Sequence, residues 1–316
     1  MVAMLGRRPR WLHAFLVVQL AGCAYTAPYV GQGPHPQIER GRPNVVLDTL
    51  GNVLAVIPKI LLLDWRFANH TISPDTESYL VRYFEARQSV VGQTHAQLNE
   101  YAPHHDLSHL VHNRNVAWPY RATIGLLTTV VIDVILPGRV FPWGDYYNPW
   151  TNTMHLYSDD PPITLHEAGH AYDINKRHYK GTYAILYIVP FFDLFFEMQA
   201  SREAIHYLKE AQDHDMEARA YKVLYPAYGT YVGHYLLPPI GTVAGVVAGH
   251  VIGRSQAAIQ QHHYRKLQKN QPAAASQTPA SVGQPQADAT ASQDPAAPPA
   301  PESSVAEPAS TGSSQP

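Results

Sequence analysis

TLHEAGHAYD, residues 164–173, places two histidines four positions apart, with a glutamate directly after the first. Residues four apart lie on one face of an α-helix, so His166 and His170 are expected to point at a common spot. Two neutral imidazoles there can bind one divalent cation, usually zinc. Glu167 lies roughly 100° further around the helix, where it cannot easily share the metal but can accept a proton from a water on it. This HExxH pattern predicts a hydrolytic metal site.

The flanking sequence supports a helix that starts just before the motif. Asp159-Asp160-Pro161-Pro162 supplies a capping residue and first-turn prolines. Ala168 and Gly169 are small, as packing beneath an active site requires. TMHLYS, residues 153–158, alternates in polarity and predicts a strand, which we expect at the sheet edge where an extended substrate would pair.

A catalytic zinc site also needs a third protein ligand and one open position. Asp173 lies a turn beyond His170, so a supporting role in the second layer is expected. Glu197 follows the apolar run FFDLFF on a separate predicted helix, where a carboxylate needs a partner. Glu197, Glu203 and Asp173 are therefore the candidates for this ligand.

Glu197-Met198-Gln199-Ala200-Ser201 resembles the E-x-[EQ]-A-D helix of gluzincin metallopeptidases, in particular the family of the prenyl-protein protease and the stress protease HtpX. The resemblance covers residues 153–208. It implies that Glu197 binds zinc and that residue 201 supports the site. Ser201 stands in place of the usual aspartate, but its hydroxyl lies one turn from Glu197. The transition-state stabiliser stays open among His206, Tyr146 and Tyr147.

The expected fold is mainly α (α+β), a zincin-like helical domain with a small β-sheet beside the metal-binding helix. Helical patterns are expected at residues 45–63 (broken near Pro58), from Pro74, at 93–115, 122–136, 191–208 and 211–225, and a loop at 144–152. The folded domain is assigned to residues 44–268. The segment 269–316, rich in Pro, Ala and Ser, is predicted to be disordered.

The N-terminus resembles a bacterial lipoprotein signal. Arg7, Arg8 and Arg10 precede a short apolar run, and Leu20-Ala-Gly-Cys23 resembles a lipobox that ends at the single cysteine of the chain. We expect a signal peptide at 1–22, a lipid on Cys23 and a tether at 23–43; an ordinary signal peptide is the alternative. The chain would then be anchored outside the cytoplasm in the bacterial cell envelope, at the outer membrane if the cell is Gram-negative.

Two further patterns are open to more than one interpretation. His105, His109 and His112 recur at helical spacing beside Asp106, and a solvated polar face is favoured over a second metal patch. The glycines of GTVAGVVAGHVIG recur every four residues. They favour a closely packed or membrane-surface helix over a true span, although a pore-related protein is another hypothesis.

These observations predict a membrane-tethered zinc endopeptidase acting on peptide or protein substrates. A catalytically inactive zincin-scaffold lipoprotein is the alternative, supported mainly by the missing aspartate at 201. The net charge of −2 gives no indication of a nucleic-acid partner, and the sequence does not specify the oligomeric state.

Overall fold

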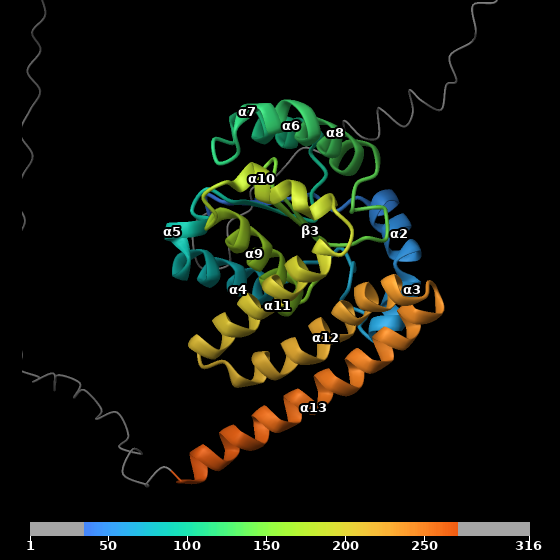
Figure 1. The fold of residues 1–316 in the computed structure, drawn as a ribbon, viewed down its shortest axis with the longest axis vertical. Coiled ribbons are helices and arrows are strands. Elements are labelled where there is room, and N and C mark those ends of the chain that lie inside the picture. Colours follow the sequence, from blue (N-terminus) through green and yellow to red (C-terminus); the bar gives the residue numbers. More distant parts are fainter. Residues whose placement is uncertain (1–34, 271–316) are drawn as a thin grey trace, which may run out of the picture. The chain divides into compact units, whose positions relative to one another are not determined.

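The computed structural model describes residues 35–270 of the 316-residue chain (Figure 1). The predicted signal peptide, Cys23 and the tail from residue 271 lie outside the described residues. The described part is mostly helical with one small mixed sheet, which confirms the expected mainly α, α+β class.

The sheet has four short strands in the order β1-β2-β4-β3. β1 (Ile38–Arg40), β2 (His95–Leu98) and β4 (Thr153–Leu156) are parallel, and β3 (Tyr146–Asn148) pairs with β4 in the antiparallel direction.

The strand predicted at 153–158 is confirmed as β4, but its expected edge position is wrong, because β2 and β3 flank it. The free edge beside it is β3, which lies in the segment expected to be a loop. β2 lies in the segment expected to be helical, and β1 places the start of folded structure before residue 44. β1 and β3 have only three residues each, which is too short for polarity alternation to reveal them.

The two faces of the sheet differ in polarity. On one face, apolar side chains belong to a single buried core with Leu165 and Ala168 of the HExxH helix; they are Ile38, Ala96, Leu98, Met154 and Leu156. The other face carries polar side chains in register: Glu39 opposite Gln97, Gln97 opposite His155, and His155 opposite Tyr146.

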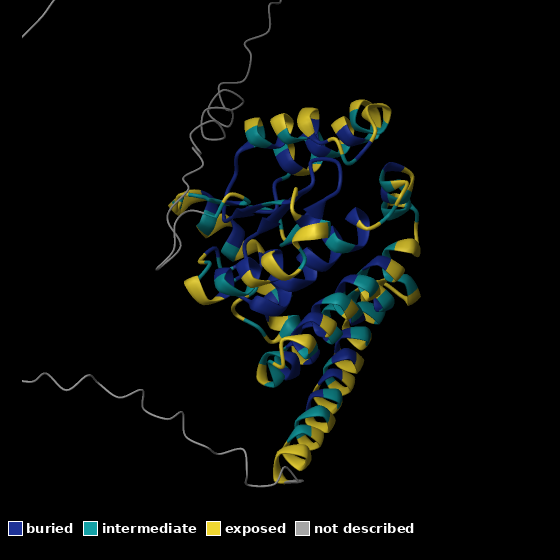
Figure 2. Cartoon of the chain, turned by 90° about the vertical axis from the view of Figure 1, so that its left-hand side faces the viewer, coloured by how far each residue is buried: buried dark blue, intermediate teal, exposed yellow. Residues whose placement is uncertain are grey.

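The predicted HExxH helix is confirmed as α9 (Pro161–Asn175), which is buried along nearly its whole length (Figure 2). It packs against α4 (Pro74–Ala86), α11 (Phe192–Glu210) and α12 (His214–Leu236). Asp160 occupies the N-cap position without capping the helix by a side-chain hydrogen bond. Its carboxylate instead accepts hydrogen bonds of 3.1 and 2.6 Å from Arg219 of α12, and Arg219 also binds Asp64 at 3.0 Å.

The other helical segments are shorter. The first predicted helix breaks at Ala55 rather than near Pro58, because a proline is tolerated in the first turn of the second half. The segments are α2 (Val45–Leu54), α3 (Val56–Leu62), α5 (Gln88–Val91), α6 (Pro103–His112), α7 (Trp118–Tyr120), η1 (Arg121–Gly125), α8 (Leu126–Thr128), η2 (Thr129–Ile135), α10 (Lys180–Ile185) and η3 (Leu186–Ile188).

The glycine stripe lies on α13 (Ile240–Asn270), which runs back along α12 (Figure 1). A Cβ added at Gly249 would lie 2.6 Å from Pro226 Cα, so only glycine permits this approach. The predicted close packing is therefore confirmed. Within residues 35–270 no individual helix combines the length and hydropathy of a membrane span, although two bent pairs, α2 with α3 and α10/η3 with α11, reach that threshold together.

Candidate metal centre

His166 and His170 project from one face of α9 and converge. Their Nε2 atoms are 3.2 Å apart, and both side chains are almost fully buried. This arrangement follows from the helical repeat, which brings residues four apart onto one face.

Glu197 of α11 completes the cluster. Its carboxylate oxygens lie 3.0 Å from His166 Nε2 and 3.4 Å from His170 Nε2. Metal–ligand bonds of about 2.0–2.1 Å give ligand–ligand distances of roughly 3.3 Å in a tetrahedron. These three side chains could therefore hold a metal ion.

Gly169 brings the two helices close enough for this contact. A Cβ added at Gly169 would lie 2.6 Å from the carbonyl oxygen of Ala200, one turn after Glu197. Because the obstruction is backbone, a side chain at 169 would push α11 away from α9. The small residue inside the motif therefore sets the distance of the third ligand.

A hydroxyl group binds the second nitrogen of each histidine. Ser201 Oγ lies 3.1 Å from His166 Nδ1, and Tyr187 OH lies 3.2 Å from His170 Nδ1. Such partners fix the ring orientation and leave Nε2 free for a metal. The sequence indicated Ser201 as a supporting residue. It gave no signal for Tyr187, which comes from the apolar segment η3.

Asp173, the other residue expected to support the cluster, raises the pKa of His170, but its carboxylate has other hydrogen-bond partners. Tyr183 and Arg177 donate hydrogen bonds of 2.6 Å to its carboxylate. Glu203, the rival ligand, forms an ion pair of 2.9 Å with Arg87 instead. Neither carboxylate belongs to the metal cluster.

Glu167 is buried beside the three ligands. Burial raises its pKa to about 8, and nearby His170 and a hydrogen bond from the Tyr147 backbone partly oppose that rise. A bound divalent cation would lower this pKa, because it stabilises the carboxylate. The side chain therefore has the environment of a tunable acid or base.

The three side chains of the cluster shift one another's pKa values. Burial disfavours ionised Glu197, but His170 and His166 outweigh burial and lower its pKa below the ordinary range. Burial lowers the pKa of His166, whereas at His170 the nearby Glu197 outweighs burial and raises the pKa. The cluster is thus a buried carboxylate between two imidazoles.

The residues expected as transition-state stabilisers point elsewhere. His206 is exposed beside Glu210, the Tyr146 hydroxyl binds Asp133, and the Tyr147 hydroxyl binds Asn152. Tyr231 of α12, which the sequence did not single out, is closer to the cluster. The Tyr231 residue is 37% exposed, and Glu197 is the main cause that raises the pKa of its hydroxyl well above the ordinary value.

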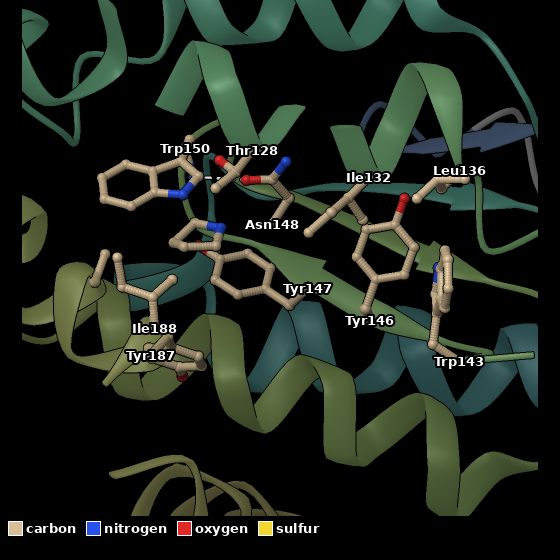
Figure 3. A pocket seen from close by; sticks show the side chains of 12 residues that line it. Thr128, Ile132, Leu136, Trp143, Tyr146, Tyr147, Asn148, Trp150, Tyr187 and Ile188 are labelled. Carbon is tan, nitrogen blue, oxygen red and sulfur yellow. Dashed lines mark hydrogen bonds between the residues drawn. The ribbon is translucent and has the colours of Figure 1, made fainter. Parts of the chain in front are cut away.

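Figure 3 shows a mostly apolar cavity of about 470 Å³. Tyr187 and Tyr147, which contact His170 and Glu167, form part of its wall. Edge strand β3 supplies one side and η2 another. The remaining lining includes Trp143, Trp150, Ile132, Leu136 and Ile188.

The histidines of α6 form the expected solvated face only in part: His112 is exposed, and the His105 side chain is 33% exposed. His109 is half-buried beside Glu39 and His95, and Asp106 is 1% exposed. The carboxylates that approach the buried side of α6, Glu39 and Asp133, come from β1 and η2, so spacing within α6 could not indicate them.

No protein-family model, curated protein or solved structure matches this chain.

Proposed function

We propose that this protein is a zinc-dependent endopeptidase with a zincin-like site, in which His166, His170 and Glu197 hold the metal. The observation that carries the proposal is the convergence of these three ligands at separations of 3.0–3.4 Å, with Glu167 adjacent. Two imidazoles and one carboxylate form a donor set that suits catalytic zinc and leaves a fourth position open.

A zinc ion bound there would polarise a water molecule and lower its pKa to near neutrality. Glu167 is placed to accept the proton of that water and deliver it to the leaving amine. We assign the Tyr231 hydroxyl, whose pKa Glu197 raises, as the donor to the oxygen that would become negative in the transition state.

The neighbouring surface favours an extended peptide as the substrate. β3 is an edge strand, so its outer backbone groups can pair with an added strand. The apolar cavity next to β3 and Tyr187 could receive one large apolar side chain of such a peptide. The substrate class is therefore an unfolded or looped protein segment with an aromatic or aliphatic residue near the cleaved bond.

Attachment to the bacterial envelope membrane is part of the proposal. The expected lipid anchor at Cys23 lies outside the described residues. The first two helices that follow it in the sequence are α2 and α3. They expose many large apolar side chains to solvent, among them Val45, Val46, Val53, Ile57 and Ile60. A surface of this kind favours contact with lipid or protein over water.

The inactive-scaffold alternative loses its main argument. It depended on the missing aspartate at position 201, yet the Ser201 hydroxyl binds His166 Nδ1 at 3.1 Å. His166 therefore has a hydrogen-bond partner at Nδ1 without an aspartate at position 201.

Glu167→Gln in the full-length protein tests the proposal. We expect the variant to retain its metal, while hydrolysis of an unfolded protein falls at least roughly 10²-fold, since general bases contribute about 10²–10⁴. The matched control is Glu210→Gln, which removes an exposed carboxylate from α11. Full activity of Glu167→Gln, or a wild-type protein that binds no zinc, would contradict the proposal.

A further inference from the structure

A buried polar layer lies on the sheet face that carries Gln97, His155 and Tyr146. These residues are opposite one another on three adjacent strands, so their side chains share this face. Sheet faces that are buried normally carry apolar side chains. The polar row therefore requires another explanation.

Two aspartates from α6 and η2 lie near this polar row. Asp106 Oδ1 of α6 lies 3.7 Å from His155 Nε2, and Asp133 Oδ1 of η2 lies 3.9 Å from the same atom. All three side chains are at most 2% exposed, and one ligand atom of each lies within 4.8 Å of the others.

Two atoms of this layer are buried without a hydrogen-bond partner. They are His155 Nε2 and Gln97 Oε1, which belong to side chains 2% and 0% exposed. The Gln97 amide contacts the cluster directly, because its Nε2 donates to Asp106 Oδ1 at 2.9 Å. A buried polar atom without a partner lowers the stability of the fold. These two atoms therefore indicate a missing cation or hydrogen-bond donor.

The two carboxylates have neutral hydrogen-bond partners. Gln97 binds Asp106, while Tyr146 at 2.9 Å and Asn148 at 2.6 Å bind Asp133. Burial, and for Asp106 also the nearby Asp133, raises the pKa of both carboxyls. Two buried carboxylates side by side are unfavourable unless a cation or proton offsets their charge.

We propose that Asp106, Asp133 and His155 form a second metal site, which binds a divalent cation such as Mn²⁺ or Zn²⁺ with Gln97 Oε1 as a further ligand. The separations of 3.7 and 3.9 Å are too long for hydrogen bonds. They are close to the spacing of roughly 3.3–3.6 Å between ligands around one ion with bonds of about 2.0–2.2 Å. Two carboxylates, an imidazole and an amide oxygen form a donor set that these metals accept.

The position of the site indicates a structural role. One cation would join α6, η2 and β4, three elements far apart in sequence. Asp133 also binds Tyr146 of edge strand β3, and the backbone of the next residue, Tyr147, binds Glu167. The site would thus stiffen the strand beside the first metal centre, although its existence does not depend on the activity of that centre.

The nearby cluster of Glu39, His95 and His109 is a useful contrast. Its side chains are partly exposed and already paired, with His105 2.9 Å from Glu39 and Thr153 3.1 Å from His109. The same argument therefore does not extend to it.

The test uses the full-length protein with His166→Ala and His170→Ala, which disable the first centre. After loading with Zn²⁺ or Mn²⁺ and desalting, we expect about one equivalent of metal per chain. Chelation should lower the melting temperature by about 5 °C or more, as expected when a tightly bound ligand is removed.

Adding Asp106→Asn and Asp133→Asn should abolish both the metal and the chelation shift. In chelator, this chain should melt no lower than its parent, because the buried like charges are gone. Glu39→Gln is the matched control and should keep the metal. A parent chain with less than a tenth of an equivalent of either metal and no chelation shift would overturn the proposal, as would metal retained after both Asp→Asn changes. If the protein with both Asp→Asn changes does not accumulate, the proposal is tested by the metal content of the parent protein and by the shift of its melting temperature on chelation.

Discussion

The hydroxyl of Ser201 lies 3.1 Å from Nδ1 of His166, so one helix supplies both Glu197, a proposed ligand, and a partner for the ring of His166. Ser201→Ala should weaken metal binding roughly 10- to 100-fold, the usual cost of losing such a partner. Competition with a chromogenic chelator measures this affinity. Ser201→Thr, which keeps a hydroxyl, should restore most of it. Ser255→Ala, on α13, should have no effect, and an unchanged affinity in Ser201→Ala would refute the orienting role.

Gly169→Ala should separate α9 from α11. The new methyl group would lie 2.6 Å from Ala200 O, so we expect the free energy of unfolding to fall by about 1–3 kcal/mol. Because the obstruction is between backbones, the loss should persist in chelator, as urea denaturation can show. Glu197→Gln should instead lose more stability when metal is present than in chelator, where only its contacts with the two imidazoles are lost. Native stability of Gly169→Ala would mean that the helices are further apart than described.

Tyr231→Phe separates binding from turnover. Removing a hydroxyl that stabilises charge in the transition state should lower kcat by roughly 10²-fold while metal content and KM change little. Tyr225→Phe, on the same helix with its hydroxyl near Lys209, is the control. Equal losses in both variants would point to a packing effect of α12 rather than a role in the reaction.

His70 gives a prediction on pH. It is 7% exposed, its Nδ1 lies 3.0 Å from Asn99 Oδ1, and burial lowers its pKa below the usual 6.5. As pH falls below 6.5, the unfolded chain takes up a proton at this position before the folded chain does. The stability that His70 contributes is therefore complete above pH 6.5 and is lost as pH falls, at up to about 1.4 kcal/mol per unit.

The comparison with His70→Asn isolates this contribution. Asparagine tolerates the positive φ of 59° at this position. The stability advantage of the wild type should be largest at pH 7–8 and should shrink between pH 6.5 and 5, as measured by urea denaturation. A difference that stays constant across this range would show that His70 does not titrate as its burial indicates.

The sequence predicted the parts of the fold that depend on local spacing. The HExxH helix, the strand at 153–156 and the close packing of α13 each follow from a repeat or a start signal. The contact between Glu197 and the histidines was also anticipated, but from a resemblance rather than from spacing, because it joins two helices.

What the sequence could not predict depends on tertiary contacts. β1 and β3 are too short for a detectable period, and all of the strands are stabilised by their neighbours in the sheet. Tyr187 and Tyr231 reach the site from segments whose patterns indicate only packing. Asp106 looked solvent-facing because its partners, Gln97, Asp133 and His155, come from three other elements.

Arg219 connects two regions that are distant in the chain. It binds Asp160, directly before the first turn of α9, and Asp64, just beyond the apolar helix α3. α3 also contacts α13, where His250 lies 3.0 Å from Leu61 O. Any displacement of α3 against the α12–α13 hairpin must therefore strain or break an ion pair at the start of the helix that bears both histidines.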